Sequence, residues 1–289
     1  MKYRHAMTLL LVSLPICVIL RIIQMVYTLD VGTGFIKPQY SAIALLISVI
    51  VCAATAAVAL LTAIADIKCK ESTTPQFAIA ISSLLLGGML IYRMVATISA
   101  KLQTISWQDS FEKNVMILFR SIAWYDTLLL ILTVLSAVVF LVYGLRNISN
   151  FKMPTITLAI PVFYFIVKLI SVFISTSSLA LVTENIFLIF TNSAVLWFMF
   201  EFSNFENGVG DANKKIKKIF ASGVASIMLC SVMAIPKFVT AIVYRTTMSA
   251  ADVSSSLLNI AIVAFILSYI ICKFGEIQKT KKVESKHSA

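Results

Sequence analysis

Four basic residues interrupt long apolar runs of this sequence. Residues 21–28 read RIIQMVYT and residues 168–175 read KLISVFIS, so each stretch has a cation followed by aliphatic residues, a polar residue and a hydroxyl. Charged side chains in such runs usually face the interior of a helix bundle or a water-filled cavity. The chemistry that these residue types offer is the binding of an anion, through charge and hydrogen bonds. The candidate ligand-binding residues are Arg21, Gln24, Arg93, Lys168 and Lys237.

The same cations could instead be neutralised within the protein or extend to the lipid headgroups. Each lies five to seven residues from the predicted outer end of its helix, which is roughly 8–10 Å at 1.5 Å per residue. A long basic side chain can span much of that distance. The possible salt-bridge partners are Asp30, Asp126 and Glu184. Four cations against three acids leave an excess of positive charge that an anionic ligand could neutralise.

The sequence offers few groups for covalent catalysis or metal binding. The only histidines are His5 and His287, which excludes an HExxH metal site and a histidine-based triad. No GxSxG motif, P-loop or dinucleotide fingerprint is present. None of the five cysteines is expected in an outer loop, and no two have metal-ligand spacing. We therefore expect no enzyme activity, no metal site and no cofactor.

One fragment suggests an enzyme nevertheless. Residues 208–211 read GVGD, which resembles the GxGD motif of membrane-embedded aspartic proteases, and Tyr125-Asp126 resembles the YD partner in the presenilin-like family. The resemblance implies two carboxylates that share a proton: Asp126 with Asp211, or Asp66 with Asp211 as in the prepilin-peptidase family. The predicted topology separates Asp126 from Asp211 by the bilayer, and the lysines after Asp211 fit the second family poorly. An aspartic protease is therefore the least favoured alternative.

Long apolar blocks must position all of these residues. Of the 289 residues 60% are hydrophobic and 13% charged, whereas soluble domains carry about 25% charged residues. Apolar stretches of about 18 residues or more are typical of membrane-spanning helices. We expect an all-α polytopic membrane protein with eight transmembrane helices. They are predicted at about 6–28, 42–65, 78–98, 123–145, 155–175, 185–203, 219–243 and 256–272.

The distribution of charge predicts the orientation. With the N-terminus inside, the inner segments hold fifteen lysines and arginines and the outer segments five, as the positive-inside rule requires. We expect a multi-pass protein of a bacterial-type cytoplasmic membrane with both termini in the cytoplasm. The net charge of +11 then reflects cytoplasmic loops rather than nucleic-acid binding. The basic tail from Lys273 is expected to contact anionic lipid headgroups.

The two halves of the chain resemble each other. Residues 92–99 read YRMVATIS and residues 236–243 read PKFVTAIV, and these follow the two opening motifs at similar intervals. We therefore interpret residues 1–150 and 151–289, the latter with the basic tail, as two copies of a four-helix unit. Four crossings return the chain to its starting side, so the copies would be parallel, as in some transporters.

These observations favour a membrane protein that binds or transports a small anionic or amphiphilic solute. The solute would occupy a cationic cavity in the outer half of the bilayer, and one half of the protein would rock against the other. The alternative is a non-transporting sensor or an anchoring subunit of a complex. In that case the cytoplasmic loop 204–218, which contains Lys214, Lys215, Lys217 and Lys218, would bind a protein partner.

Overall fold

The computed structural model of the chain is almost entirely helical in the residues that it describes. These are 3–28, 36–64, 76–103, 124–149, 154–175, 182–208, 212–245 and 248–287. The long helices are α1 (Tyr3–Thr28), α2 (Ser41–Ile64), α3 (Phe77–Gln103), α5 (Trp124–Ser149), α6 (Ala159–Ser175), α7 (Val182–Glu206), α8 (Ala212–Tyr244) and α9 (Ala250–His287). Two short 3₁₀ helices, η1 (Pro38–Tyr40) and η2 (Thr155–Leu158), precede α2 and α6.

Within the described residues, eight helices are long and apolar enough to cross a membrane. This confirms the expectation of an all-α chain with eight helices that are apolar enough to span a membrane, which is compatible with an integral membrane protein. Such helices satisfy their backbone hydrogen bonds internally, as a hydrocarbon environment requires. The sequence underestimated several of them; among these, the sixth span reaches Glu206 and the seventh begins at Lys215. Both helices continue through charged residues because these charges are paired inside the protein, as described below.

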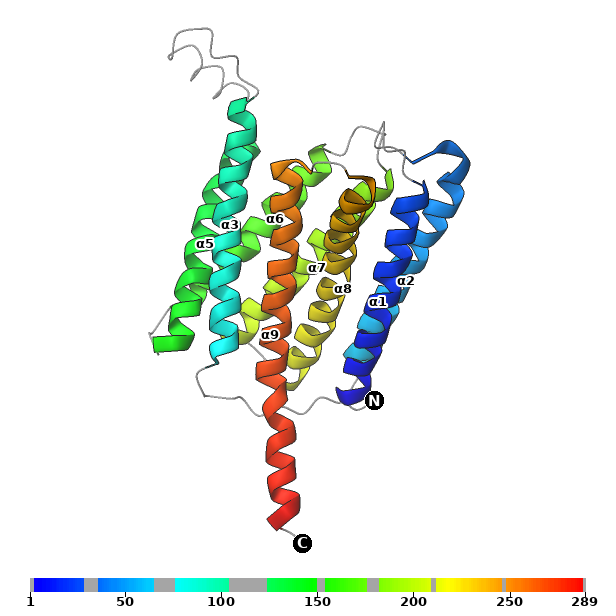
Figure 1. Cartoon of the computed structure of the whole chain (residues 1–289). Helices are drawn as coiled ribbons and strands as arrows, with labels where there is room; N and C mark the ends of the chain where they lie inside the picture. Colours follow the sequence, from blue (N-terminus) through cyan, green and yellow to red (C-terminus); the bar gives the residue numbers. More distant parts are fainter. Residues whose placement is uncertain are drawn as a thin grey trace, which may run out of the picture.

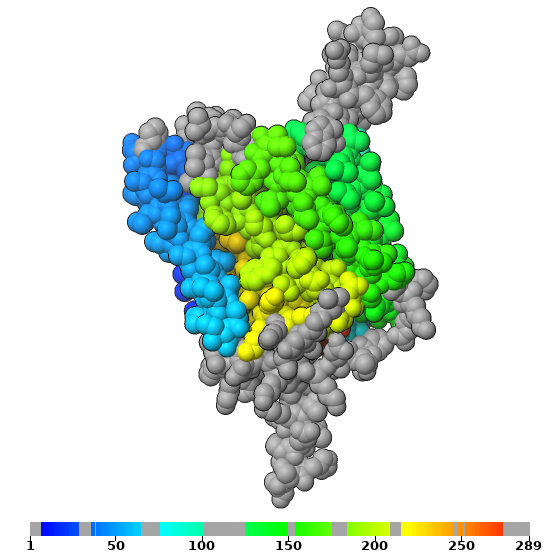
Figure 2. Space-filling view, turned by 180° about the vertical axis from the view of Figure 1, so that it is seen from behind, coloured from blue at the N-terminus to red at the C-terminus, as the bar shows by residue number. Residues whose placement is uncertain are grey.

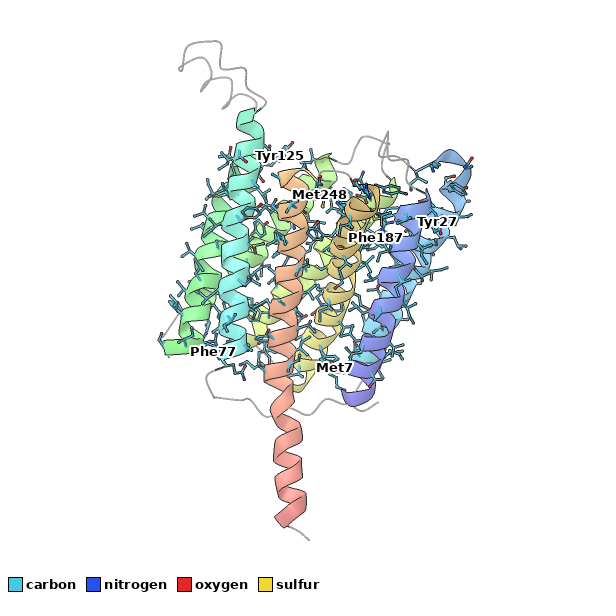
Figure 3. All side chains as sticks on the ribbon, in the orientation of Figure 1. Met7, Tyr27, Phe77, Tyr125, Phe187 and Met248 are labelled. Carbon is cyan, nitrogen blue, oxygen red and sulfur yellow. The ribbon has the colours of Figure 1, made fainter. Side chains whose placement is uncertain are left out.

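The helices form one bundle in which successive spans alternate in direction (Figure 1). Tyr27, Tyr125 and Met248 lie at one end, and Met7 and Phe77 lie at the other (Figure 3). We call these the Tyr27 end and the Met7 end. The first and last helices both have their free ends at the Met7 end, where α9 continues beyond the other helices (Figure 1).

Helix α8 forms the centre of the bundle. It packs against α1, α2, α7 and α9, and the membrane-spanning part of α8 is almost completely buried. The order in space differs from the order in the chain, because α9 lies between α8 and α3, and α6 connects α5 with α7. The α1–α2 hairpin is therefore attached to the rest of the bundle mainly through α8.

The interfaces of the bundle depend on small residues and aromatic rings. At Gly87 an added Cβ would lie 2.9 Å from Leu141 Cγ, and at Gly144 one would lie 2.8 Å from Leu84 Cγ. These two glycines let α3 and α5 approach closely. Nearer the Met7 end, six buried rings of α5, α7 and α9 pack edge to face or stack. They belong to Phe140, Tyr143, Phe198, Phe202, Phe265 and Tyr269.

Several predicted features lie outside the described residues. Asp30, Asp66 and Asp211 are among them. The division at residue 150 and the internal repeat stay predictions.

Candidate functional site

The main candidate site is a group of polar side chains near the Tyr27 end, which we call the Arg21 cluster. It consists of Arg21, Gln24, Glu184, Phe187 and Lys237. The Glu184 carboxylate joins two cations: its Oε1 lies 3.5 Å from Arg21 Nη2 and its Oε2 lies 3.6 Å from Lys237 Nζ. The cluster therefore connects α1, α7 and α8, and Figure 3 shows the labelled Phe187 in this region, between α8 and α1.

The Arg21 side chain is only 3% exposed, and three neighbouring side chains contact its guanidinium group. Its Nη1 donates a 2.7 Å hydrogen bond to Gln24 Oε1. Its guanidinium carbon lies 4.3 Å from the centre of the Phe187 ring, a cation–π contact that is stronger when water is excluded. Glu184 completes the set, so the guanidinium has a fixed position rather than a path to the headgroups.

Gln24 anchors this arrangement to α2. Its Nε2 donates to the Ala44 carbonyl at 2.6 Å and lies 3.0 Å from Ser48 Oγ. The Tyr244 hydroxyl donates to the Val26 carbonyl and ties α8 to α1 one turn nearer the helix ends. The cluster is thus built on helices rather than loops, which favours a defined geometry.

The cluster carries an excess of positive charge. Arg21 and Lys237 contribute two cations and Glu184 one carboxylate, so one positive charge is left uncompensated within this group. Moreover, Arg21 Nε is buried and has no hydrogen-bond partner among the described residues. A buried donor without a partner costs free energy, and an anionic oxygen would satisfy both this donor and the excess charge.

The other two predicted cations are Lys168, on α6, and Arg93, on α3, and the two charges interact electrostatically. The Lys168 side chain is buried, and its Nζ lies 5.3 Å from the centre of the Phe165 ring. Among the described residues no carboxylate lies within ion-pair distance of Lys168. This second pair is thus a like-charge pair.

The five predicted site residues therefore fall into two groups. Arg21, Gln24 and Lys237 meet in the Arg21 cluster, whereas Lys168 and Arg93 belong to α6 and α3, which do not contribute to this cluster. Of the three predicted acidic partners, Glu184 bridges two cations. Asp30 lies outside the described residues, and Asp126 lies in the first turn of α5.

A cavity does accompany the site, but its walls are apolar rather than cationic. It has a volume of about 440 Å³ and lies between α2 and α7, with α8 behind. Figure 2 shows this face, on which atoms of α8 are visible between the other two helices. We call it the α2–α7 groove. Small residues of α2 form part of its wall.

Sequence reasoning missed two buried acids near the Met7 end. Glu206 accepts hydrogen bonds from the hydroxyls of Tyr143 and Tyr269 at 3.2 and 3.0 Å. Its carboxylate also lies 3.7 Å from Arg146 and 3.6 Å from Lys273. Glu201, five residues earlier, lies 3.9 Å from Lys218. An acid in the otherwise apolar run around Glu201 was the available signal, but Glu206 fell beyond the predicted end of its helix.

No constellation for catalysis or metal binding is found in the described part of the chain. No group of three potential metal ligands is present there. Two carboxylates of the protease-like pattern, Asp66 and Asp211, lie outside it.

Comparison of the chain with family models, with curated proteins and with solved structures finds no match.

Proposed function

We propose that this membrane protein binds, and carries across the bilayer, a small solute with an anionic group. The observation that supports this most is the Arg21 cluster, in which a buried guanidinium keeps a free Nε donor and an excess positive charge. Structural salt bridges normally balance their charges and satisfy their donors. An anion bound beside Arg21 and Lys237 would do both.

The depth of the Arg21 cluster below the helix ends is suitable for a site that a solute occupies during transport. Seven residues separate Arg21 from the end of α1 at Thr28, so the guanidinium lies roughly 10 Å inside the helix end. An anion bound there has already crossed part of the hydrocarbon layer. The like-charge pair of Lys168 and Arg93 would provide a second station for the same charge.

The two cation pairs also support the proposed repeat. Arg21 and Lys237 come from the first and seventh spans, and Lys168 and Arg93 come from the fifth and third. A pseudo-twofold rotation that exchanges the two halves would exchange these pairs. The helix packing favours the α1–α2 hairpin as the moving part, because it contacts the bundle mainly through α8 and supplies one side of the cluster.

The positive-inside distribution supports a cytoplasmic membrane with both termini in the cytoplasm, which would place the Arg21 cluster in the outer half of the bilayer. The runner-up, a sensor or anchoring subunit, would use the lysines of loop 204–218. Two of these are engaged within the chain: Lys215 donates to the Asn204 carbonyl at 3.3 Å, and Lys218 pairs with Glu201. This leaves less of the lysine cluster for a protein partner.

The test compares bound molecules in three proteins by native mass spectrometry after detergent purification. The helix variant carries Arg21→Gln, Arg93→Gln, Lys168→Gln and Lys237→Gln. The matched control, the loop variant, loses the same charge through Lys214→Gln, Lys215→Gln, Lys217→Gln and Lys218→Gln. These lysines of the predicted loop 204–218 lie in the first turns of α8. The double variant Arg21→Gln, Lys237→Gln serves if the fourfold helix variant does not fold.

A discrete anionic molecule that is retained by the wild type and the loop variant, but lost from a folded helix variant, would support the proposal. Its mass would identify the class of solute. Equal adducts on all three proteins would overturn it. A loss of function in the loop variant alone, with capture of a partner by the wild-type loop, would establish the runner-up.

A further inference from the structure

The α2–α7 groove is a second feature that needs an explanation, because helices of a membrane protein usually pack closely. Its walls are Cys52, Thr55, Ala56, Ala59, Leu60 and Ala63 of α2, Phe190, Ser193, Ala194 and Trp197 of α7, and Ala225 and Leu229 of α8. Five of these twelve residues are alanines, and their short side chains do not fill the space between the helix backbones. Neither wall carries a charged residue.

The groove begins where the Arg21 cluster ends. Cys52 of α2 and Phe190 of α7 are the groove residues nearest to the cluster along their helices. On α2, Cys52 is one turn from Ser48, which lies against Gln24. On α7, Phe190 is one turn from Phe187, which stacks on the guanidinium. Two independent helices thus run from the cationic cluster directly into the apolar groove.

We propose that the groove holds the hydrocarbon chain of an anionic amphiphile whose headgroup lies at the Arg21 cluster. This inference rests on the proposed function and narrows its solute to a lipid-like molecule with a phosphate or similar anionic head. The continuity of charge and apolar surface selects this occupant. A helix of a second copy could fill the groove, but it would leave the excess charge and the free Nε of Arg21 unsatisfied.

The dimensions fit a chain of one leaflet. The α2 wall from Cys52 to Ala63 is about 16 Å long at 1.5 Å per residue. The hydrocarbon core of a bilayer is about 30 Å thick, so one leaflet is roughly half of that. Lipid tails are as apolar as the groove, and the groove alone would therefore discriminate little between chains. The anionic head must supply most of the preference for the bound state.

Because the anionic head rather than the chain should determine binding, the test compares two amphiphiles that differ only in the head. The wild-type protein is placed in nanodiscs of zwitterionic phosphatidylcholine that contain hexadecyl phosphate with a photoreactive diazirine in its chain. The same diazirine on hexadecanol is the neutral control. After irradiation, peptide mass spectrometry maps the cross-linked residues. We expect cross-links at 52–63 and 190–197 that are at least tenfold more frequent with the phosphate than with the alcohol.

Two variants separate the groove from the cluster. Ala56→Trp fills the groove, whereas Ala57→Trp places the same ring on the neighbouring residue of α2, which is exposed and does not line the groove. We expect Ala56→Trp to reduce the phosphate cross-links about tenfold and Ala57→Trp to leave them unchanged. Ala56→Leu replaces Ala56→Trp if the larger substitution prevents folding. The double variant Arg21→Gln, Lys237→Gln should lower the cross-links to the level of the alcohol.

The outcomes distinguish this inference from the proposed function. If the double variant Arg21→Gln, Lys237→Gln abolishes the cross-links but Ala56→Trp does not, the anion-binding site is supported and the hydrocarbon chain does not bind in the groove. If inorganic phosphate binds the wild type and Ala56→Trp equally, but hexadecyl phosphate gives no cross-links at 52–63 or 190–197, the solute is a soluble anion and the groove inference falls. If the hexadecyl phosphate probe and the hexadecanol probe label the groove equally in all variants, the groove binds ordinary lipid chains and the inference is overturned. The native mass spectrometry above then decides the proposed function by itself.

Discussion

At the scale of single residues, Glu184 controls the charge of the Arg21 cluster. Its carboxylate pairs with both Arg21 and Lys237, so under the proposed function it competes with an anionic ligand for these two cations. Its negative charge therefore stabilises the empty site and opposes the occupied one. These two effects have opposite signs on stability and on binding, so a single substitution can separate them.

We expect Glu184→Gln to lower the stability of the empty protein by about 1–3 kcal/mol, because two buried or partly buried cations lose their partner. The same change should strengthen the binding of hexadecyl phosphate by about tenfold, because a competing negative charge is removed. Thermal unfolding with and without the amphiphile measures both quantities.

Glu201→Gln is the matched control, since it removes the same charge from α7 far from the cluster. It should leave the affinity for the amphiphile unchanged. Weaker binding of the amphiphile by Glu184→Gln than by the wild type would mean that Glu184 orients the ligand or the cations. Such a result would contradict competition between Glu184 and the ligand.

At the scale of helices, the contact between α3 and α5 depends on glycine. A Cβ at Gly87 would lie 2.9 Å from Leu141 Cγ and 3.0 Å from the Ala137 carbonyl oxygen, whereas one at Gly88 would have no atom within 4 Å. The Leu141 side chain can move, but the backbone oxygen cannot move without shifting the helix. The two neighbouring glycines thus have different roles.

We expect Gly87→Ala to destabilise the protein by about 1–3 kcal/mol, as overpacking usually does. Gly88→Ala should be neutral or slightly stabilising, because alanine is the better helix former. Unfolding in detergent measured by circular dichroism tests the pair. Equal effects of the two substitutions would show that α3 and α5 separate easily at this point.

The Met7 end of the bundle is held by Glu206 of α7. It receives two tyrosine hydroxyls and faces two cations, from α5 and α9. Glu201 is equally buried but faces only Lys218, which is 62% exposed. The number and burial of the partners, rather than the burial of the acid, should determine how much each carboxylate contributes.

We therefore expect Glu206→Gln to cost about 3–5 kcal/mol, the usual effect of removing one partner from a buried charged network. Glu201→Gln should cost about 1 kcal/mol or less, because exposed ion pairs contribute little. Denaturation of both variants under the same conditions compares them. A larger loss in Glu201→Gln would show that the pairing with Lys218 matters more than its distance indicates.

At the scale of the whole molecule, the eight spans place the free ends of α1 and α9 at the same end of the bundle (Figure 1). The proposed function places this end in the cytoplasm, on the basis of the positive-inside rule. This orientation decides whether the Arg21 cluster lies in the outer or the inner half of the bilayer.

Labelling with a membrane-impermeant maleimide tests the orientation in a variant without native cysteines. We expect Lys37→Cys, near the start of α2, to be labelled in intact cells. Thr280→Cys, in the part of α9 beyond the bundle, should be labelled only after the membrane is opened. The reverse pattern would invert the protein and place the Arg21 cluster in the inner half of the bilayer.

The number of the spans and their approximate positions could be predicted from the sequence for a simple reason. A hydrocarbon layer demands helices of a certain length, and an apolar run of that length is visible without knowledge of its neighbours. The cations were conspicuous for the same reason, because Arg21 and Lys168 interrupt such runs. These features depend only on the chain and its solvent.

The neighbours of each helix could not be predicted in this way. Nearly all surfaces of these helices are apolar, so hydrophobicity does not distinguish lipid from protein as a partner. The central place of α8, the meeting of Arg21 with Glu184 across 163 residues, and the groove between α2 and α7 follow from side-chain shapes in three dimensions. Apolar runs thus defined the spans and marked the cations, whereas long-range packing determined which cations share a carboxylate and where an apolar chain has room to lie.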